Sequence, residues 1–154
     1  MTTDPMRTLV EEHQLVSEWL STMWNAMGLL DGEGPEDLIR LQAFLRANVR
    51  EHFEFEERHV FPALLSPDVA PTARVLVNEL RREHVEILGD CSRLFSGLSW
   101  AMASDDSVDA IRALKKLTRE IIDKILAHAA REDRHLLPLV QEHLQAISKS
   151  IESS

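Results

Sequence analysis

Tyrosine is absent from this sequence of 154 residues, and Cys91 is its only cysteine. The chain therefore offers no phenolate ligand for a metal and no tyrosyl radical. A single cysteine cannot form an intrachain disulfide or a cysteine-rich zinc module, and it suits a reducing compartment. We expect a cytoplasmic protein whose metal-binding side chains, if it has any, are histidines and carboxylates.

Positive charge and long apolar stretches are also scarce. The sequence has 26 acidic and 17 basic residues, a formal net charge of -9, and such a field repels nucleic acid and anionic membrane surfaces. Uncharged stretches such as residues 94–104 are far shorter than the ~20 residues of a membrane-spanning helix. Residues 1–14 carry charges throughout, unlike a secretory signal. We expect neither nucleic acid nor a membrane as a partner.

Glycine and proline are few, and they divide the chain into four long segments. The breaks fall at residues 31–35, 66–71 and 104–107. Between them apolar residues recur every three or four positions, which is typical of amphipathic helices. Short connections make consecutive helices antiparallel neighbours. The prediction is all-α: one domain over 1–154, an up-down-up-down four-helix bundle with helices at about 4–30, 35–65, 71–100 and 106–136 and a tail helix at about 139–151.

Histidines interrupt the apolar seam of every segment. The first and third segments carry His13 and His84, while the second and fourth turn polar near their ends. At about 1.5 Å per residue, His13 and His52 lie at the same height from the turn that joins their helices. The predicted bundle therefore brings polar side chains from all four helices into one layer of its core.

The two halves of the sequence repeat this pattern. Residues 52–62 match residues 128–138 at an offset of 76, and residues 9–13 resemble residues 80–84 at an offset of 71. Two related helical hairpins would place two similar half-sites face to face.

Histidine and glutamate four residues apart share one face of a helix, so His52 with Glu56, and His128 with Glu132, can point at one place. Buried ionisable groups are strongly destabilising unless they are paired or coordinate a metal. One interpretation is a His–Glu hydrogen-bond network without metal. The other is a pair of first-row ions, for which four imidazoles and two carboxylates are a suitable donor set.

This ordered set of motifs, with the Phe-Pro or Leu-Pro that follows the second and fourth elements, resembles the hemerythrin-like (HHE cation-binding) family over nearly the whole chain. The resemblance implies a four-helix bundle around a non-haem di-iron centre, in which carboxylates and an oxo or hydroxo group bridge the irons. It implies terminal ligands at His13, His52, His84 and His128, and bridging ligands at Glu56 and Glu132.

Two departures bear on function. Oxygen-carrying hemerythrins have a second histidine where this chain has Leu88, and an aspartate five residues after the last histidine, where this chain has Glu132 at four. The family resemblance then favours binding of, or reaction with, dioxygen, peroxide or nitric oxide over reversible oxygen carriage. Peroxide disproportionation and oxygen or iron sensing are the implied roles, with no protein partner identified.

Other interpretations of the same residues stay open. Glu56-x-x-His59 and Glu132-x-x-His135 also fit a ferritin-like iron-oxidising bundle, in which Glu12 and Glu83 would be ligands. A redox-inert module that holds zinc is another possibility, and zinc or manganese can replace iron at such donors. Six further residues are expected to support the site or to be alternative ligands: His59, His135, Glu57, Asp133, Glu12 and Glu83. Of these, His59 and His135 are candidate proton shuttles.

Overall fold

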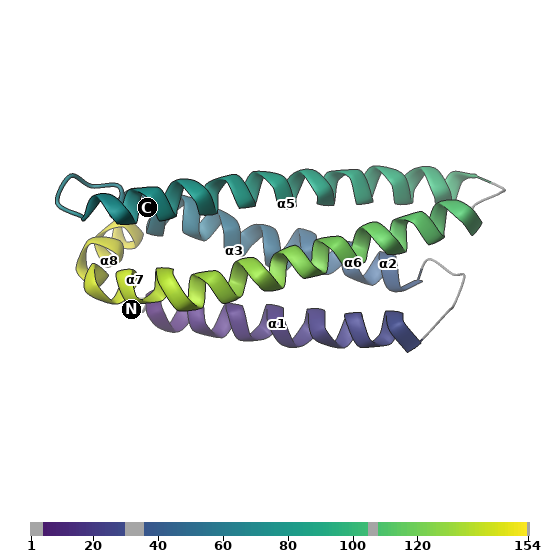
Figure 1. The fold of residues 1–154 in the computed structure, drawn as a ribbon, viewed down its shortest axis with the longest axis horizontal. Coiled ribbons are helices and arrows are strands. Elements are labelled where there is room, and N and C mark those ends of the chain that lie inside the picture. The colour runs from purple at the N-terminus through teal and green to yellow at the C-terminus, as the bar shows by residue number, and fades with distance from the viewer. Residues whose placement is uncertain (1–4, 30–35, 105–107, 154) are drawn as a thin grey trace.

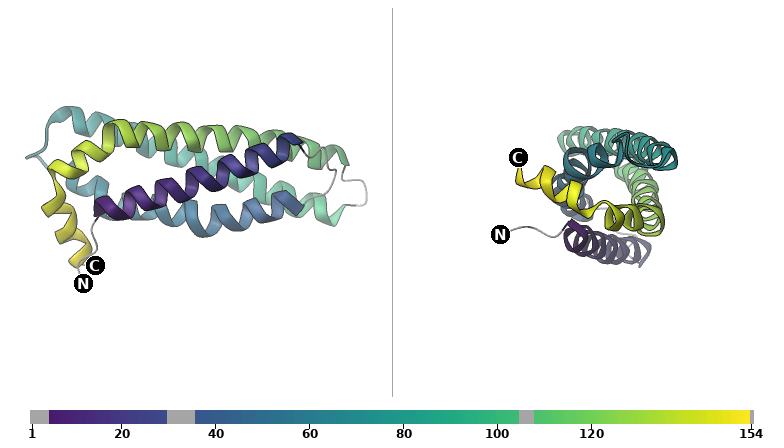
Figure 2. Two further views of the ribbon diagram at one scale, coloured as in Figure 1. Left: turned by 90° about the horizontal axis from the view of Figure 1, so that it is seen from below. Right: turned by 90° about the vertical axis from the view of Figure 1, so that its left-hand side faces the viewer.

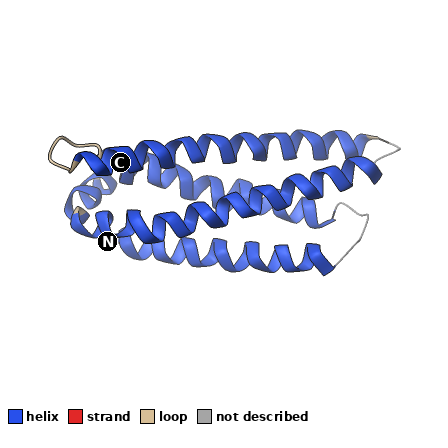
Figure 3. Cartoon of the chain, viewed as in Figure 1, coloured by secondary structure: helices blue, strands red, loops and turns tan. Residues whose placement is uncertain are grey.

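The computed structural model describes residues 5–29, 36–104 and 108–153, and within these ranges it contains helices and turns without a strand (Figure 3). This confirms the predicted all-α class. The elements are α1 (Pro5–Leu29), α2 (Glu36–Phe44), η1 (Leu45–Val49), α3 (Arg50–Phe55), η2 (Glu56–Val60), α4 (Phe61–Leu64), α5 (Pro71–Ala103), α6 (Val108–Arg131), η3 (Glu132–Leu136), α7 (Leu137–Glu142) and α8 (Leu144–Glu152).

These elements join into four long helical runs that lie lengthwise in one bundle (Figure 1). The runs are α1, α2 through α4, α5, and α6 through α7. α5 lies beside α6, and α6 also contacts α1. The short α8 crosses one end of the bundle, the end at which α1 begins (Figure 2).

The observed helix bounds differ from the prediction mainly at the C-terminal ends. α5 continues to Ala103, and the fourth run continues to Glu142, beyond the expected ends at 100 and 136. α8 starts at Leu144, after a break at His143, and not at 139. The predicted bounds at 4, 30, 35 and 106 lie outside the described residues.

Two prolines lie inside helical runs, at positions where the sequence predicts a kink or an end. Pro62 and Pro138 each follow a π-helical turn, η2 and η3. In these turns the N–H of Phe61 bonds to the carbonyl of Glu56, and the N–H of Leu137 to that of Glu132. The wider turn shifts the backbone carbonyls that a proline ring would otherwise meet in an α-helix. The fourth run therefore passes through Pro138.

Each long helix buries one stripe and exposes the rest. In α5 the buried residues recur at three- or four-residue intervals from Ala73 to Ala101, apart from the adjacent pair Asp90 and Cys91. Charged residues occupy much of the remaining surface. No helix within the described ranges combines the length and the apolar character needed to cross a membrane.

The core consists of two apolar clusters separated by a polar layer. The larger cluster contains Val16, Phe53, Ile87 and Ile125, and the smaller cluster, next to α8, contains Leu9, Val60, Leu80 and Leu136. Along each run, a histidine of the core lies between a member of one cluster and a member of the other. The polar layer is therefore closed by apolar side chains at both ends.

Gly89 lies on the exposed side of α5, and a Cβ atom added there would meet nothing within 4 Å. We expect Gly89→Ala to raise the free energy of unfolding by about 0.5–1 kcal/mol, because alanine loses less backbone entropy in a helix. Urea unfolding measures this. Gly97→Ala is the matched control: its Cβ would lie 2.6 Å from Cδ2 of Leu114, so its gain should be smaller. Equal gains would contradict this assignment.

Asp90 is a buried carboxylate between α5 and α6. It accepts a hydrogen bond of 2.7 Å from Nζ of Lys124 and one from Arg93. Burial alone would raise its pKa, but Lys124 and Arg93 bring the pKa below its ordinary value. Its stabilising effect should therefore be complete above the unfolded pKa of about 3.9 and be lost as pH falls through the lower folded pKa.

We expect Asp90→Asn to lower the unfolding free energy by about 1–2 kcal/mol at pH 7, and this difference from the unaltered protein to shrink below about pH 4. Thermal unfolding from pH 3 to pH 7 measures it. A difference that stays constant down to pH 3 would show that the carboxylate charge is not responsible.

Candidate metal centre

The structure brings together the six residues that the sequence singles out as main candidates. They come from all four helical runs: His13 from α1, His52 from α3, Glu56 from η2, His84 from α5, His128 from α6 and Glu132 from η3. Each is at most 4% exposed. The i,i+4 spacing puts each glutamate on the same helix face as its histidine, and both glutamates begin a π turn. π turns of this kind are frequent at functional sites.

The six residues form two overlapping groups. One contains the pair His13 and His52, which we call the N-terminal pair, and the other contains the pair His84 and His128, the C-terminal pair; both groups include Glu56 and Glu132. Within a group the candidate ligand atoms lie within 4.8 Å of one another. The two Nε2 atoms are 3.0 Å apart in each pair.

The two glutamates lie between the pairs. Oε1 of Glu56 is 3.3 Å from Nε2 of both His52 and His84. Oε1 of Glu132 is 3.2 Å from Nε2 of His13 and 3.3 Å from that of His128. Each carboxylate therefore touches at least one histidine of each pair, and Oε1 of Glu132 also lies 3.8 Å from Nε2 of His52.

Four more carboxylates contact the Nδ1 atoms on the outer side of the histidines. The Asp133 carboxylate is 2.6 Å from Nδ1 of His13, those of Glu57 and Glu83 are 3.0 Å from Nδ1 of His84 and His128, and Glu12 contacts Nδ1 of His52. An ionised carboxylate can only accept, so each Nδ1 donates, and in the neutral imidazole Nε2 then keeps its lone pair. The four imidazoles thus present acceptors to the centre when they are neutral.

These contacts repeat between the halves of the chain. Glu12 on His52 corresponds to Glu83 on His128, and Glu57 on His84 corresponds to Asp133 on His13. Each carboxylate bonds to a histidine of another helix, although two of them are sequence neighbours of a histidine. The sequence repeat therefore appears in space as two matching half-sites.

The centre holds more acceptors than donors. All four carboxylate oxygens of Glu56 and Glu132 are buried without a hydrogen-bond partner. Buried acceptors of this kind are costly unless something positive satisfies them. Two Nε2 lone pairs that face each other at 3.0 Å pose the same problem. Bound cations would resolve both, and imidazole and carboxylate are common ligands of first-row metal ions, so the residues fit a metal centre.

Ionisation of the two glutamates is strongly coupled. Burial raises the pKa of Glu56, and the adjacent Glu132 raises it further. Burial would also raise the pKa of Glu132, but contacts with Glu56 and the histidines bring it well below its ordinary value. The pKa of Glu56 therefore lies above its ordinary value and that of Glu132 below it, and a bound cation would favour the ionised form of both.

The four histidines titrate differently. Burial lowers the pKa of His84 to about 3, and the neighbouring His128 contributes. Burial also acts against protonation of His13, His52 and His128, but contacts with Glu132 and, for His52, with Glu56 and Glu12 raise their pKa values overall. Neutral imidazole is the form that binds a metal.

His59 and His135 do not belong to either group. His59 is buried, but its Nδ1 is 3.2 Å from Oγ of Ser150 in α8, and burial lowers its pKa. His135 is exposed. The π turns explain the separation, because the extra residue per turn rotates the side chain three positions after each glutamate. The Glu-x-x-His ligand pairs of the ferritin-like alternative are therefore not brought together, and Glu12 and Glu83 contact histidines at Nδ1.

Three residues near the centre were missed by the sequence analysis. The ring of Phe53 stacks on His84 with centroids 3.9 Å apart. Nε of Arg81 donates to Glu57 at 3.0 Å, and Arg131 contacts Glu83 and Glu79. Both arginines lie three residues from a core histidine, which is the signal that could have indicated them.

A small cavity adjoins the centre. Its volume is about 10 Å³, the room that one water-sized molecule needs. Both histidines of the N-terminal pair line the cavity, together with His128 and Glu132. The rest of its wall is apolar and consists of Val16, Val49, Phe53, Ile125 and Ala129. Only a very small ligand could enter it without displacing side chains.

The helical bundle with two His/Glu groups defines the chain as a metal-binding helical domain. The family model described as the hemerythrin HHE cation binding domain matches residues 4–140, and the chain belongs to this family, as the sequence predicts. Neither a curated protein nor a solved structure gives a significant match. The family binds metal cations, and α8 lies beyond the matched residues.

Proposed function

We propose that this chain is a non-haem di-iron protein that binds or reacts with dioxygen, peroxide or nitric oxide. The observation that carries the proposal is the set of four unpartnered oxygens of Glu56 and Glu132, shared between two histidine pairs. Two carboxylates that each touch both pairs suit two cations and two bridging ligands better than a single ion. In this proposal each histidine pair holds one iron.

Two iron ions at this centre would supply redox chemistry toward a small oxygen- or nitrogen-containing ligand. The chain itself contributes the wall of the cavity, where Val16, Val49 and Ile125 exclude bulk water. The four outer carboxylates hold the Nδ1 protons and thereby fix the orientation of the imidazoles.

The outer carboxylates of the N-terminal pair reach solvent: the side chains of Asp133 and Glu12 are 52% and 36% exposed. A cation on Nε2 would leave their imidazoles no free nitrogen to relay a proton, so we assign these carboxylates a role in orienting the ligands. The candidate proton shuttles His59 and His135 lie outside both groups. The reaction that the centre suits is peroxide disproportionation, in which one peroxide is oxidised to dioxygen and a second is reduced to water.

The proposal extends to topology and location. The helical runs pass back and forth between the two ends of the bundle in Figure 1, which supports the up-down-up-down antiparallel arrangement. The single Cys91 is buried, in keeping with a reducing cytoplasm. A small ligand is the proposed partner, and the net charge of -9 argues against nucleic acid.

Metal content and reactivity test this function together. Protein purified from cells with sufficient iron should contain about two irons per chain and absorb in the near-ultraviolet and visible range. Hydrogen peroxide should change this absorption and release dioxygen at an oxygen electrode. One or two zinc ions without a visible band would contradict the redox proposal, and iron that is oxidised in many equivalents per chain would favour the ferritin-like alternative.

A further inference from the structure

The outer carboxylates of the two histidine pairs differ in their charged neighbours. On the C-terminal pair, Glu57 accepts from Arg81 at 3.0 Å and Glu83 accepts from Arg131. On the N-terminal pair, the ion pairs formed within the described part of the chain include no lysine or arginine on Glu12 or Asp133. The two half-sites therefore match in the hydrogen bonds to their histidines but differ in the positive charge next to their outer carboxylates.

A charged group next to an outer carboxylate changes how strongly the histidine bonded to that carboxylate binds a cation. A carboxylate that accepts from Nδ1–H increases the electron density at Nε2 and strengthens it as a ligand. A guanidinium on that carboxylate withdraws part of its negative charge and also repels a nearby cation. Both effects weaken the C-terminal pair relative to the N-terminal pair.

The two arginines do not act equally. Arg131 divides its contacts between Glu83 and Glu79, so two carboxylates compensate its charge. Arg81 pairs with Glu57 alone among the ion pairs of the described residues, and its guanidinium also lies 5.9 Å from the centroid of the Phe61 ring. Arg81 should have the larger effect. Its side chain is 38% exposed, so solvent screens part of its charge.

We propose that the two cation positions are inequivalent: a cation occupies the position of His13 and His52 first, and Arg81 and Arg131 lower the affinity of the position of His84 and His128. This inference rests on the proposed dinuclear centre. The six central residues alone would give the two positions equal affinity. In this inference the two arginines determine which position binds a cation first.

Titration of the metal-free protein with Co²⁺, followed by the visible absorption of the bound ion, tests the order. The unaltered protein should bind two ions in two phases, separated about tenfold or more in affinity. His13→Gln should remove the tighter phase and His84→Gln the weaker one. The reverse assignment of phases would overturn the proposal.

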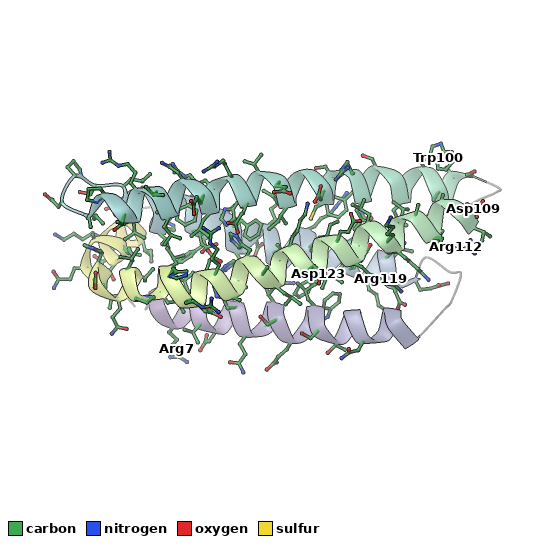
Figure 4. The ribbon with its side chains drawn as sticks, viewed as in Figure 1. Arg7, Trp100, Asp109, Arg112, Arg119 and Asp123 are labelled. Carbon is green, nitrogen blue, oxygen red and sulfur yellow. The ribbon has the colours of Figure 1, made fainter. Side chains whose placement is uncertain are left out.

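Arg81→Gln should strengthen the weaker phase about tenfold and bring the two phases together, whereas Arg81→Lys, which keeps the charge, should leave them apart. Arg112→Gln is the control, because it removes the same charge from an exposed pair with Asp109 at the other end of the bundle (Figure 4). A weaker second phase in Arg81→Gln would show that Arg81 only positions Glu57, and would overturn the proposal.

The stoichiometry separates the two proposals. Two ions bound in a single phase would overturn the inequivalence and leave the dinuclear centre intact. If the unaltered protein bound no Co²⁺, both proposals would be overturned.

Discussion

Replacing Glu56 by glutamine should reduce binding from two cations per chain to at most one and weaken the remaining affinity on the order of 100-fold or more. Glu56 contacts one histidine of each pair, so its loss affects both positions. Glutamine has nearly the same shape but cannot carry the negative charge that balances a cation.

The same substitution should leave the metal-free protein nearly as stable as before. Burial and the adjacent Glu132 raise the pKa of the Glu56 carboxyl group, so a neutral amide removes a charge that this position disfavours in the absence of metal. We expect the unfolding free energy without metal to change by less than about 1 kcal/mol. The stabilisation that metal gives, about 4 kcal/mol at a thousand times the dissociation constant, should fall to about 1.4 kcal/mol or less at the same metal concentration, because binding weakened 100-fold leaves only about ten times the dissociation constant.

Equilibrium dialysis and thermal unfolding, with and without metal, measure both effects. Glu54→Gln is the matched control: it changes an exposed carboxylate two residues earlier on the same run, in an ion pair with Arg50. Unchanged stoichiometry in Glu56→Gln would rule out a shared carboxylate at the centre.

Phe61→Ala should cost about 3–5 kcal/mol of unfolding free energy, because it removes a large, fully buried ring from the smaller core cluster. A domain of this size is stable by only about 5–15 kcal/mol, so the variant should unfold at a much lower urea concentration. The ring also stacks against His84 at a centroid distance of 5.4 Å. Its loss therefore opens space beside the C-terminal pair as well.

Urea titration of the metal-free protein measures this loss. Val85→Ala, at a position of α5 that is 74% exposed, is the control and should change the unfolding free energy by less than about 0.5 kcal/mol. If the two variants were equally stable, the smaller cluster would not contribute to the core as its burial indicates.

The sequence predicted which face of each helix is buried, but it did not predict where the helices contain π turns. The three- and four-residue spacing around His13, His84, His52 and His128 fixes which side of each helix is buried, and the structure agrees. Periodicity does not show where a π turn replaces an α turn. Such a turn places Glu56 in the centre and separates His59 from it, so the role of His59 could not be settled from spacing alone.

The sequence also could not predict which side chains on different helices contact one another. Glu12 adjoins His13 in the sequence but contacts His52, and Glu83 adjoins His84 but contacts His128. The relative rotation and height of two helices decide such pairs, and these depend on packing of the whole core. Arg81 was missed for the same reason, because its partner Glu57 is 24 residues away.

Each half of the chain supplies one glutamate to the ligand group of the other half, so the centre connects the two halves. The segment up to Leu64 supplies Glu56 to the group of the C-terminal pair, and the segment from Pro71 onward supplies Glu132 to the group of the N-terminal pair. Neither half alone contains a full group, so cations bound here would cross-link the two halves. A chain cut between them would then stay assembled as long as its metal remained bound.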